Sequence, residues 1–210
     1  MIERIKEEAK YLMEENGSHG WEHVERVYNL AKNIGKTEGC DMEILEIAAI
    51  LHDIGRPEES RQKGNVCHAE IGSLLAEGIL KQYGYGDEFI SKVQHCILAH
   101  RKKKGREPQT KEAKVLFDAD KLDSLGAIGV GRLFFFACEH GAKVHNSPEI
   151  NIENTQSYTK EDTAYREWHM SLRHLKDKFH TEEGERIAKE RLKFMDEFFE
   201  RINEEVRGKC

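Results

Sequence analysis

The residues best suited to chemistry are four histidine and aspartate side chains that fall on expected helices. His23 lies within one apolar-periodic segment, His52 and Asp53 are consecutive near the end of a second, and Asp120 lies in a third. A carboxylate on an apolar helix face is costly to bury unless it is paired or ligated. Imidazole and carboxylate groups together suit a divalent metal. The lack of a thiolate favours Mn, Mg, Fe, Co or Ni over a structural Zn site.

Each of these side chains also has an ordinary interpretation as a core residue with its own hydrogen-bond partner. A single histidine on an apolar helix face is more often such a core residue than a ligand. Four residues of this kind would need four separate partners, whereas one shared metal ion would satisfy all of them. From the residues alone, both interpretations stay open.

The elements that must position these residues are helices. Apolar residues recur at helical spacing along most of the chain, and the alternation typical of strands is nearly absent. Caps are expected at Ser18, Asp41 and Thr110, and the last helix should begin at Thr181. Gly55 and Pro57 should end the helix that carries His52. A charged loop should follow to about residue 65, and 141–158 should be irregular. The helical segments are 2–15, 21–34, 44–51, 71–80, 89–98, 110–122, 126–140, 165–179 and 181–202.

These segments predict an all-α protein with about eight or nine helices in one domain spanning 1–210. A metal-binding core would cover about 18–125, and the C-terminal helices, about 159–206, would pack on it. The Gly-rich stretch 126–132 lies in a helical hairpin rather than after a strand, so close helix packing explains it better than a dinucleotide-binding loop.

The composition excludes several classes of protein. The chain has 210 residues, 34% of them charged, and a net charge of −6 from 33 basic and 39 acidic side chains. No apolar stretch is long enough for a membrane span, and no global positive field exists to hold long nucleic acid. Five widely spaced cysteines without a C-x-x-C pair indicate reduced thiols and a cytoplasmic protein. The charged segment 2–15 does not look like a secretion signal.

The order of the four candidate ligands resembles the H…HD…D signature of the HD-domain superfamily of metal-dependent phosphohydrolases. The likeness extends to S-H-G-W-E-H-V-E-R-V, A-A-I-L-H-D-I-G-R, C-H-A-E-I-G, D-A-D-K-L-D-S-L-G-A-I-G and the C-terminal T-E-E-G-E-R-I-A-K-E-R-L-K-F-M. These strings look like a small, stand-alone bacterial and archaeal subfamily, and only about 141–158 resembles it weakly. The resemblance implies an HD-domain helical bundle in which His23, His52, Asp53 and Asp120 bind one catalytic metal. Asp118 and Asp123 are the local rivals to Asp120.

Two further histidines are candidates for the same site, because some HD relatives carry extra histidines that bind a second metal. His68 heads the string H-A-E-I-G, and His95 lies in V-Q-H-C-I-L-A-H. We expect one ion rather than two, with His68 or His95 contacting phosphate, ordering water or handing a proton to the leaving oxygen. His100 follows His95 by five positions, about 140° around a helix, so we do not expect both to face one ion.

Phosphate chemistry also needs positive charge near the reacting group. Arg56 follows the His-Asp turn, Lys121 follows Asp120, and Arg101 begins a basic loop that runs to residue 106. These three are the predicted substrate-binding residues. For the rest of the basic loop, a solvated surface is the alternative interpretation.

The residues and the resemblance together predict a metal-dependent phosphohydrolase that acts on a small-molecule phosphate ester, in particular a nucleotide. Asp53 would hold the metal and accept a hydrogen bond from the attacking water. The subfamily implies hydrolysis of a nucleoside triphosphate to monophosphate and pyrophosphate, with phosphomonoester and cyclic phosphodiester hydrolysis also open. The alternatives are a di-iron oxygenase and a catalytically silent metal- or nucleotide-binding regulator. The oligomeric state is open, a homodimer included.

Overall fold

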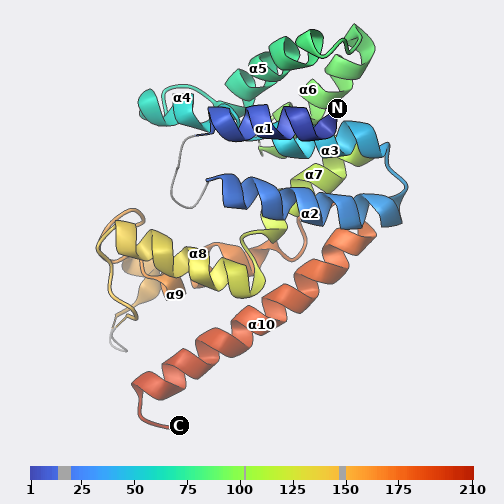
Figure 1. The fold of residues 1–210 in the computed structure, drawn as a ribbon. Helices are drawn as coiled ribbons and strands as arrows, with labels where there is room; N and C mark the ends of the chain where they lie inside the picture. The colour runs from blue at the N-terminus through green and yellow to red at the C-terminus, as the bar shows by residue number, and fades with distance from the viewer. Residues whose placement is uncertain (14–19, 102, 147–149) are drawn as a thin grey trace. The chain divides into compact units, whose positions relative to one another are not determined.

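The computed structural model describes residues 1–13, 20–101, 103–146 and 150–210, so Ser18 and Lys102 lie outside the described residues. Every regular element within these ranges is helical, which confirms the all-α prediction (Figure 1). Two units make up the chain. The first unit comprises Met1–Asp120 with His180–Gly184, and the second unit comprises Lys121–Phe179 with Glu185–Cys210. The predicted single domain over 1–210 stays a prediction.

The first unit is built around the apolar helix α3 (Met42–Leu51). Apart from Glu46, every residue of α3 from Ile44 onward is buried, as suits a helix that is apolar on all sides. The Asp41 carboxylate accepts hydrogen bonds from the backbone at the start of α3, which confirms the predicted cap. The helices that pack on α3 are α1 (Ile2–Leu12), α2 (Trp21–Glu38) and α6 (Asp87–His100).

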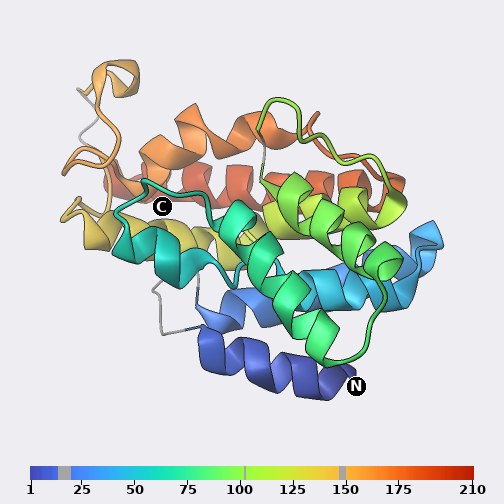
Figure 2. The same cartoon turned by 90° about the horizontal axis from the view of Figure 1, so that it is seen from above.

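The remaining helices of the first unit carry or support the candidate ligands. Helix α5 (His68–Gln82) lies beside α6, as two perpendicular views agree (Figures 1 and 2). Helix α7 (Lys111–Leu122) begins after Thr110, whose Oγ1 accepts a hydrogen bond from Ala113 N at 3.2 Å. Thr181 caps α10 (Glu182–Val206) in the same way, with Gly184 N at 3.1 Å. The cap predicted at Thr110 is therefore confirmed, and Thr181, expected to begin the last helix, is found to cap it.

The segment after α3 differs from the sequence prediction. Helix α4 (Arg56–Arg61) occupies part of the range where a charged loop was expected. Pro57 suits a first helical turn because an N–H there would have no partner within the helix. Glu58 and Glu59 add negative charge at the end of the helix that favours it. Pro57 therefore lies in the first turn of a new helix instead of only ending the helix before it.

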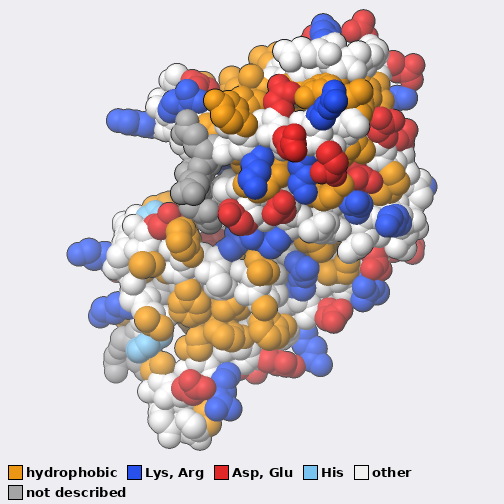
Figure 3. Space-filling model, viewed as in Figure 1, with side chains coloured by type: hydrophobic (Ala, Val, Ile, Leu, Met, Phe, Trp, Pro, Cys, Tyr) orange, Lys and Arg blue, Asp and Glu red, His pale blue; other side chains and the backbone are white. Residues whose placement is uncertain are grey.

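The second unit contains α8 (Gly126–Glu139), η2 (Ile152–Asn154), α9 (Ala164–Met170), η3 (Leu172–Leu175) and most of α10. The helix predicted over 165–179 is shorter, because the chain leaves helical geometry at Ser171 (φ −123°, ψ −69°). Exposed apolar side chains gather over α8 and α10, among them Ile128, Phe135 and Phe194 (Figure 3). Within the described part of the chain, no helix has both the length and the hydropathy to cross a bilayer.

Candidate metal centre

The candidate ligands converge at the turn between α3 and α4. His52 continues the helical conformation of α3 (φ −60°, ψ −35°), and Asp53 follows it, with both residues fully buried. At Gly55 the turn passes so close to α5 that an added Cβ would lie 2.2 Å from the carbonyl oxygen of His68. Only glycine leaves room for this approach. Gly55, two residues after Asp53, therefore allows the His-Asp pair to lie beside His68.

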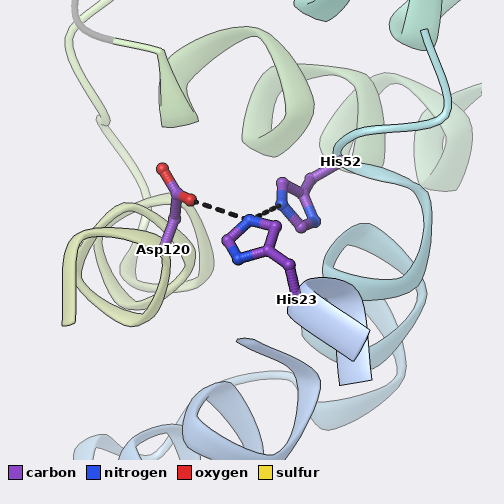
Figure 4. Close-up of side chains that lie close together, drawn as sticks. All are labelled: His23, His52 and Asp120. Carbon is purple, nitrogen blue, oxygen red and sulfur yellow. Dashed lines mark hydrogen bonds and ion pairs between the residues drawn. The ribbon is translucent and has the colours of Figure 1, made fainter. Parts of the chain in front are cut away.

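Three of the predicted ligands form what we term the first ligand group: His23, His52 and Asp120. Their candidate donor atoms lie within 4.8 Å of one another, although they come from α2, the end of α3 and α7. His23 Nε2 lies 3.3 Å from Asp120 Oδ1 and 3.4 Å from His52 Nε2 (Figure 4). Both imidazoles are buried, whereas the Asp120 side chain is 12% exposed.

A second ligand group consists of Asp53, His68 and His100, all buried, with donor atoms again within 4.8 Å of one another. The two imidazoles face each other, with 3.2 Å between His68 Nε2 and His100 Nε2. Asp53 Oδ1 lies 3.4 Å from the first of these nitrogens and 3.5 Å from the second. This group takes its residues from the α3–α4 turn and from α5 and α6.

Asp53 lies between the two groups. Its Oδ2 is 3.6 Å from Nε2 of both His23 and His52, while its Oδ1 faces the second group. Arg56 Nε forms an ion pair with Oδ1 at 3.0 Å, but neither Asp53 oxygen has a hydrogen-bond partner among the described residues. A buried carboxylate without hydrogen bonds is costly. A cation between the groups would remove that cost.

The hydrogen bonds of the imidazoles show which nitrogens face the site with a lone pair. His52 Nδ1 lies 2.8 Å from Ala49 O, and His100 Nδ1 lies 2.6 Å from Ile97 O. A carbonyl oxygen only accepts, so each Nδ1 donates and the neutral ring presents an unprotonated Nε2. Burial lowers the pKa of His52 and of His68 to about 4, so both rings are neutral at pH 7. Neutral imidazole is the form that ligates metal.

The donor set fits a divalent metal. It offers four imidazole nitrogens and two carboxylates, with no thiolate in either group. Burial alone would raise the pKa of Asp53, but its neighbours His52 and Arg56 hold that pKa well below its usual range. Asp53 is therefore an anion held in the interior. An ionised carboxylate flanked by the neutral imidazoles of His52 and His68 is an arrangement that a cation would complete.

The two acidic rivals of Asp120 have other roles. The Asp118 carboxylate accepts hydrogen bonds from the backbone N–H groups of His180 and Thr181 and from the Thr181 hydroxyl at 2.7 Å. It therefore anchors the start of α10. Asp123 accepts a hydrogen bond from Arg132 Nη1 at 2.6 Å within the second unit. Of the three aspartates, only Asp120 is a member of a ligand group.

His95 belongs to neither ligand group, and His100 takes the place that was expected for it. His95 Nε2 accepts a hydrogen bond from Gln109 N at 3.1 Å. His100 lies on the buried face of α6, three residues after Ile97 and seven after Val93. As expected for two residues five positions apart on one helix, His95 and His100 do not share a ligand group. The histidine that joins the group is His100 rather than His95. Its position on the apolar stripe of α6 is the sequence signal that could have found His100.

Two of the three predicted substrate cations, Arg56 and Arg101, meet at a carboxylate that the sequence interpretation missed. Glu59 Oε2 is 3.2 Å from Arg56 Nη1, and its Oε1 is 2.6 Å from Arg101 Nη1. Burial opposes ionisation of Glu59, but His68 and Arg101 lower its pKa to about 2. Lys121 follows Asp120 in α7, is half-buried, and begins the second unit. Arg101 also lines a cavity of about 500 Å³ together with Cys67, Glu70 and Lys103.

The fold and site define an all-α protein with two adjacent groups of histidine and aspartate side chains that could hold a metal ion. The family model for the HD domain matches residues 20–125, a range that includes every member of both ligand groups. The chain belongs to the HD-domain family.

Relatives extend this similarity over nearly the whole chain. YpgQ of Bacillus subtilis, an uncharacterized protein, is 33% identical over 204 residues, which cover 94% of this chain and 89% of that one. The crystal structure of YpgQ in complex with ADP superposes with a TM-score of 0.75 at 25% identity over both whole chains. An HD-superfamily hydrolase from Bacillus thuringiensis gives a TM-score of 0.77 at 26% identity, covering 98% of this chain and 96% of that one. The chain therefore has the fold of HD-superfamily hydrolases.

Proposed function

We propose that the protein is a metal-dependent phosphohydrolase that acts on a nucleotide. The observation that carries the proposal is Asp53, a fully buried carboxylate without hydrogen bonds that stands between two sets of imidazole nitrogens. Arg56 compensates this charge only in part, because it pairs with Oδ1 and neither oxygen has a hydrogen-bond partner among the described residues, and an incompletely compensated buried anion is costly to a fold. The arrangement suits the binding of divalent cations.

The ligand set supports two ions rather than the single ion expected from the sequence. His23, His52 and Asp120 would hold one, His68 and His100 the other, and Asp53 would serve both, one oxygen toward each group. Divalent ions at such a site supply Lewis-acid polarisation of a phosphoryl group and a lower pKa for water. His68 cannot be both a metal ligand and the proton donor expected from the sequence, because each role would use its Nε2 atom.

The chain's own residues would bind and orient the substrate. Arg56 and Arg101 carry guanidinium groups next to the second ligand group, and such groups pair with phosphate oxygens through two parallel hydrogen bonds. Arg101 also reaches the cavity of about 500 Å³, which offers room for the part of the substrate beyond the reacting phosphate. The ADP in the crystal structure of YpgQ supports a nucleotide as the substrate class.

The test is a screen of nucleoside mono-, di- and triphosphates, cyclic nucleotides and simple phosphate esters with Mn²⁺, Mg²⁺, Co²⁺ and Ni²⁺. We expect metal-dependent release of phosphate or pyrophosphate, and identification of the products assigns the bond that is cut. Removal of metal with a chelator should abolish turnover, and adding the metal back should restore it. Absence of hydrolysis across the whole panel with metal-loaded protein would refute the proposal.

One specific observation favours a second candidate, a di-iron oxygenase. The second ligand group contains two histidines, His68 and His100, and a histidine-rich second site is what that chemistry requires. Iron content of the purified protein and oxygen uptake separate the two functions. Two iron atoms per chain with substrate-dependent oxygen consumption would favour the oxygenase over the phosphohydrolase.

A further inference from the structure

The histidines of the two ligand groups are not all held in the same way. His52 and His100 each point Nδ1 at a backbone carbonyl of their own helix, three residues earlier in the chain. His68 instead points Nδ1 at the side chain of Glu59, with 2.8 Å to Oε2. A helix fixes its own carbonyl, but a side-chain acceptor must itself be held in place. The orientation of His68 therefore depends on Glu59.

Glu59 is held by contacts to both of its oxygens. Oε1 accepts from Arg101 Nη1 at 2.6 Å and from the backbone N–H of His68 at 3.4 Å. Oε2 accepts from Arg56 Nη1 at 3.2 Å besides facing His68 Nδ1. The side chain is only 15% exposed. Four contacts around one carboxylate leave it little rotational freedom, so it can direct the ring that it touches.

The local sequence explains why a glutamate stands at this position. Helix α4 begins at Arg56, and Pro57 and Glu59 both lie in the first turn of that short helix. Helix α4 packs on α5, which begins at His68. The Glu59 carboxylate thus meets the first backbone N–H of α5, where negative charge is favoured. The same contact places the Glu59 carboxylate beside the His68 ring.

We propose that Glu59 is the positioning residue of the second ligand group. It keeps the proton of His68 on Nδ1 and directs Nε2 toward Asp53, while Arg101 and Arg56 hold Glu59 in place. This inference rests on the proposed two-ion site and names the residue that determines how well its second ion binds. A carboxylate behind a ligating histidine fixes the ring and strengthens it as a donor, and loss of such a partner typically weakens metal binding about 10- to 100-fold.

The test is a calorimetric titration of the metal-free full chain with Mn²⁺, comparing wild type with Glu59→Gln, Glu59→Asp and Glu59→Ala. Wild type should bind two ions. Glu59→Gln keeps an acceptor oxygen at the same reach and should weaken one ion by only a few-fold. Glu59→Asp keeps the charge but withdraws the carboxylate by one methylene, so it should weaken that ion about 10- to 100-fold, as should Glu59→Ala. The other ion should keep its wild-type affinity in all variants.

Glu58→Ala is the matched control, because Glu58 is the neighbouring glutamate of α4 and its side chain pairs with Arg61 and Gln62 within the described part of the chain. It should bind both ions as wild type does. Circular dichroism verifies that each variant is folded. If Glu59→Ala is unstable, the Mn²⁺ affinities of Glu59→Gln and Glu59→Asp still test the positioning role. Equal weakening of both ions, or an Asp variant that binds better than the Gln variant, would overturn the positioning role. A wild-type chain that takes up no second ion would instead contradict the two-ion site itself, and the role of Glu59 with it.

Discussion

The two ligand groups differ in what surrounds their histidines. In the first group, His52 is oriented by a backbone carbonyl, and the group is completed by Asp120, whose side chain has some exposure to solvent. In the second group, all three members are buried, but His68 is oriented by Glu59, which two arginines hold. His52 of the first group and His100 of the second are therefore positioned by their own helices, whereas His68 of the second group is positioned by a network of charged side chains. Charged side chains can exchange partners with a substrate, whereas a helix carbonyl cannot.

The largest effect should come from the residue that the two groups share. Asp53→Asn removes the charge that faces both groups, so we expect binding of both ions to be lost and turnover to fall by more than about 100-fold, since loss of a mere supporting partner already costs about 10- to 100-fold. The measurements are metal content after dialysis and the rate of nucleotide hydrolysis. Circular dichroism should remain that of wild type. A variant that retains two ions would show that Asp53 is not shared.

The next test separates the groups. His23→Ala removes an Nε2 donor from the first group, and His100→Ala removes one from the second, so each variant should bind one Mn²⁺ ion instead of two. Calorimetric titration gives the stoichiometry. His95→Ala is the matched control from the same helix as His100, and it should bind two ions because His95 belongs to neither group. Loss of both ions in either single-group variant would mean that the groups do not act separately.

The two groups also differ in how much of each could be predicted from the sequence. The helices followed from apolar spacing, and the caps at Asp41 and Thr110 followed from side-chain chemistry. The members of the first group were predicted because residue type and chain order carry the information. Glu59 could not be found in this way, because its role comes from the packing of α4 on α5 and lies in a stretch that was expected to be a loop.

His100 was missed for a different reason. The correct angular argument was applied to His95 and His100, but the burial of the α6 face was not used to choose between them. The assignment of Asp120 over Asp118 shows the opposite case. Both lie on α7 and both were candidates, and the partner that engages Asp118 lies more than sixty residues away at His180 and Thr181. Sequence spacing cannot reveal such a long-range contact.

A smaller effect is expected where the backbone brings the groups together. Gly55→Ala would place a Cβ 2.2 Å from His68 O, so either the α3–α4 turn or the start of α5 must shift. We expect a loss of about 1–3 kcal/mol in the free energy of unfolding, as for other overpacked sites, measured by urea denaturation. Gly78→Ala is the control, because a Cβ at that position of α5 meets nothing within 4 Å and alanine favours a helix. Equal stability of the two variants would mean that the close approach at Gly55 is not needed.

The smallest effect should come from Arg101, which lies at the edge of the second group with 44% of its side chain exposed. Its guanidinium both holds Glu59 and lines the cavity, so Arg101→Ala should weaken a phosphate contact as well as the support of His68. A charge-assisted hydrogen bond contributes about 1.5–3 kcal/mol, and solvent exposure places this one at the low end, or roughly ten-fold in kcat/KM. Arg101→Lys should recover part of the loss, since it restores the charge but not the two-pronged geometry. If Arg101→Ala changes only KM, Arg101 acts through the substrate alone. If kcat and Mn²⁺ affinity fall together with an unchanged KM, Arg101 acts through Glu59. The charged side chains around His68 are then the feature that distinguishes the second ligand group from the first.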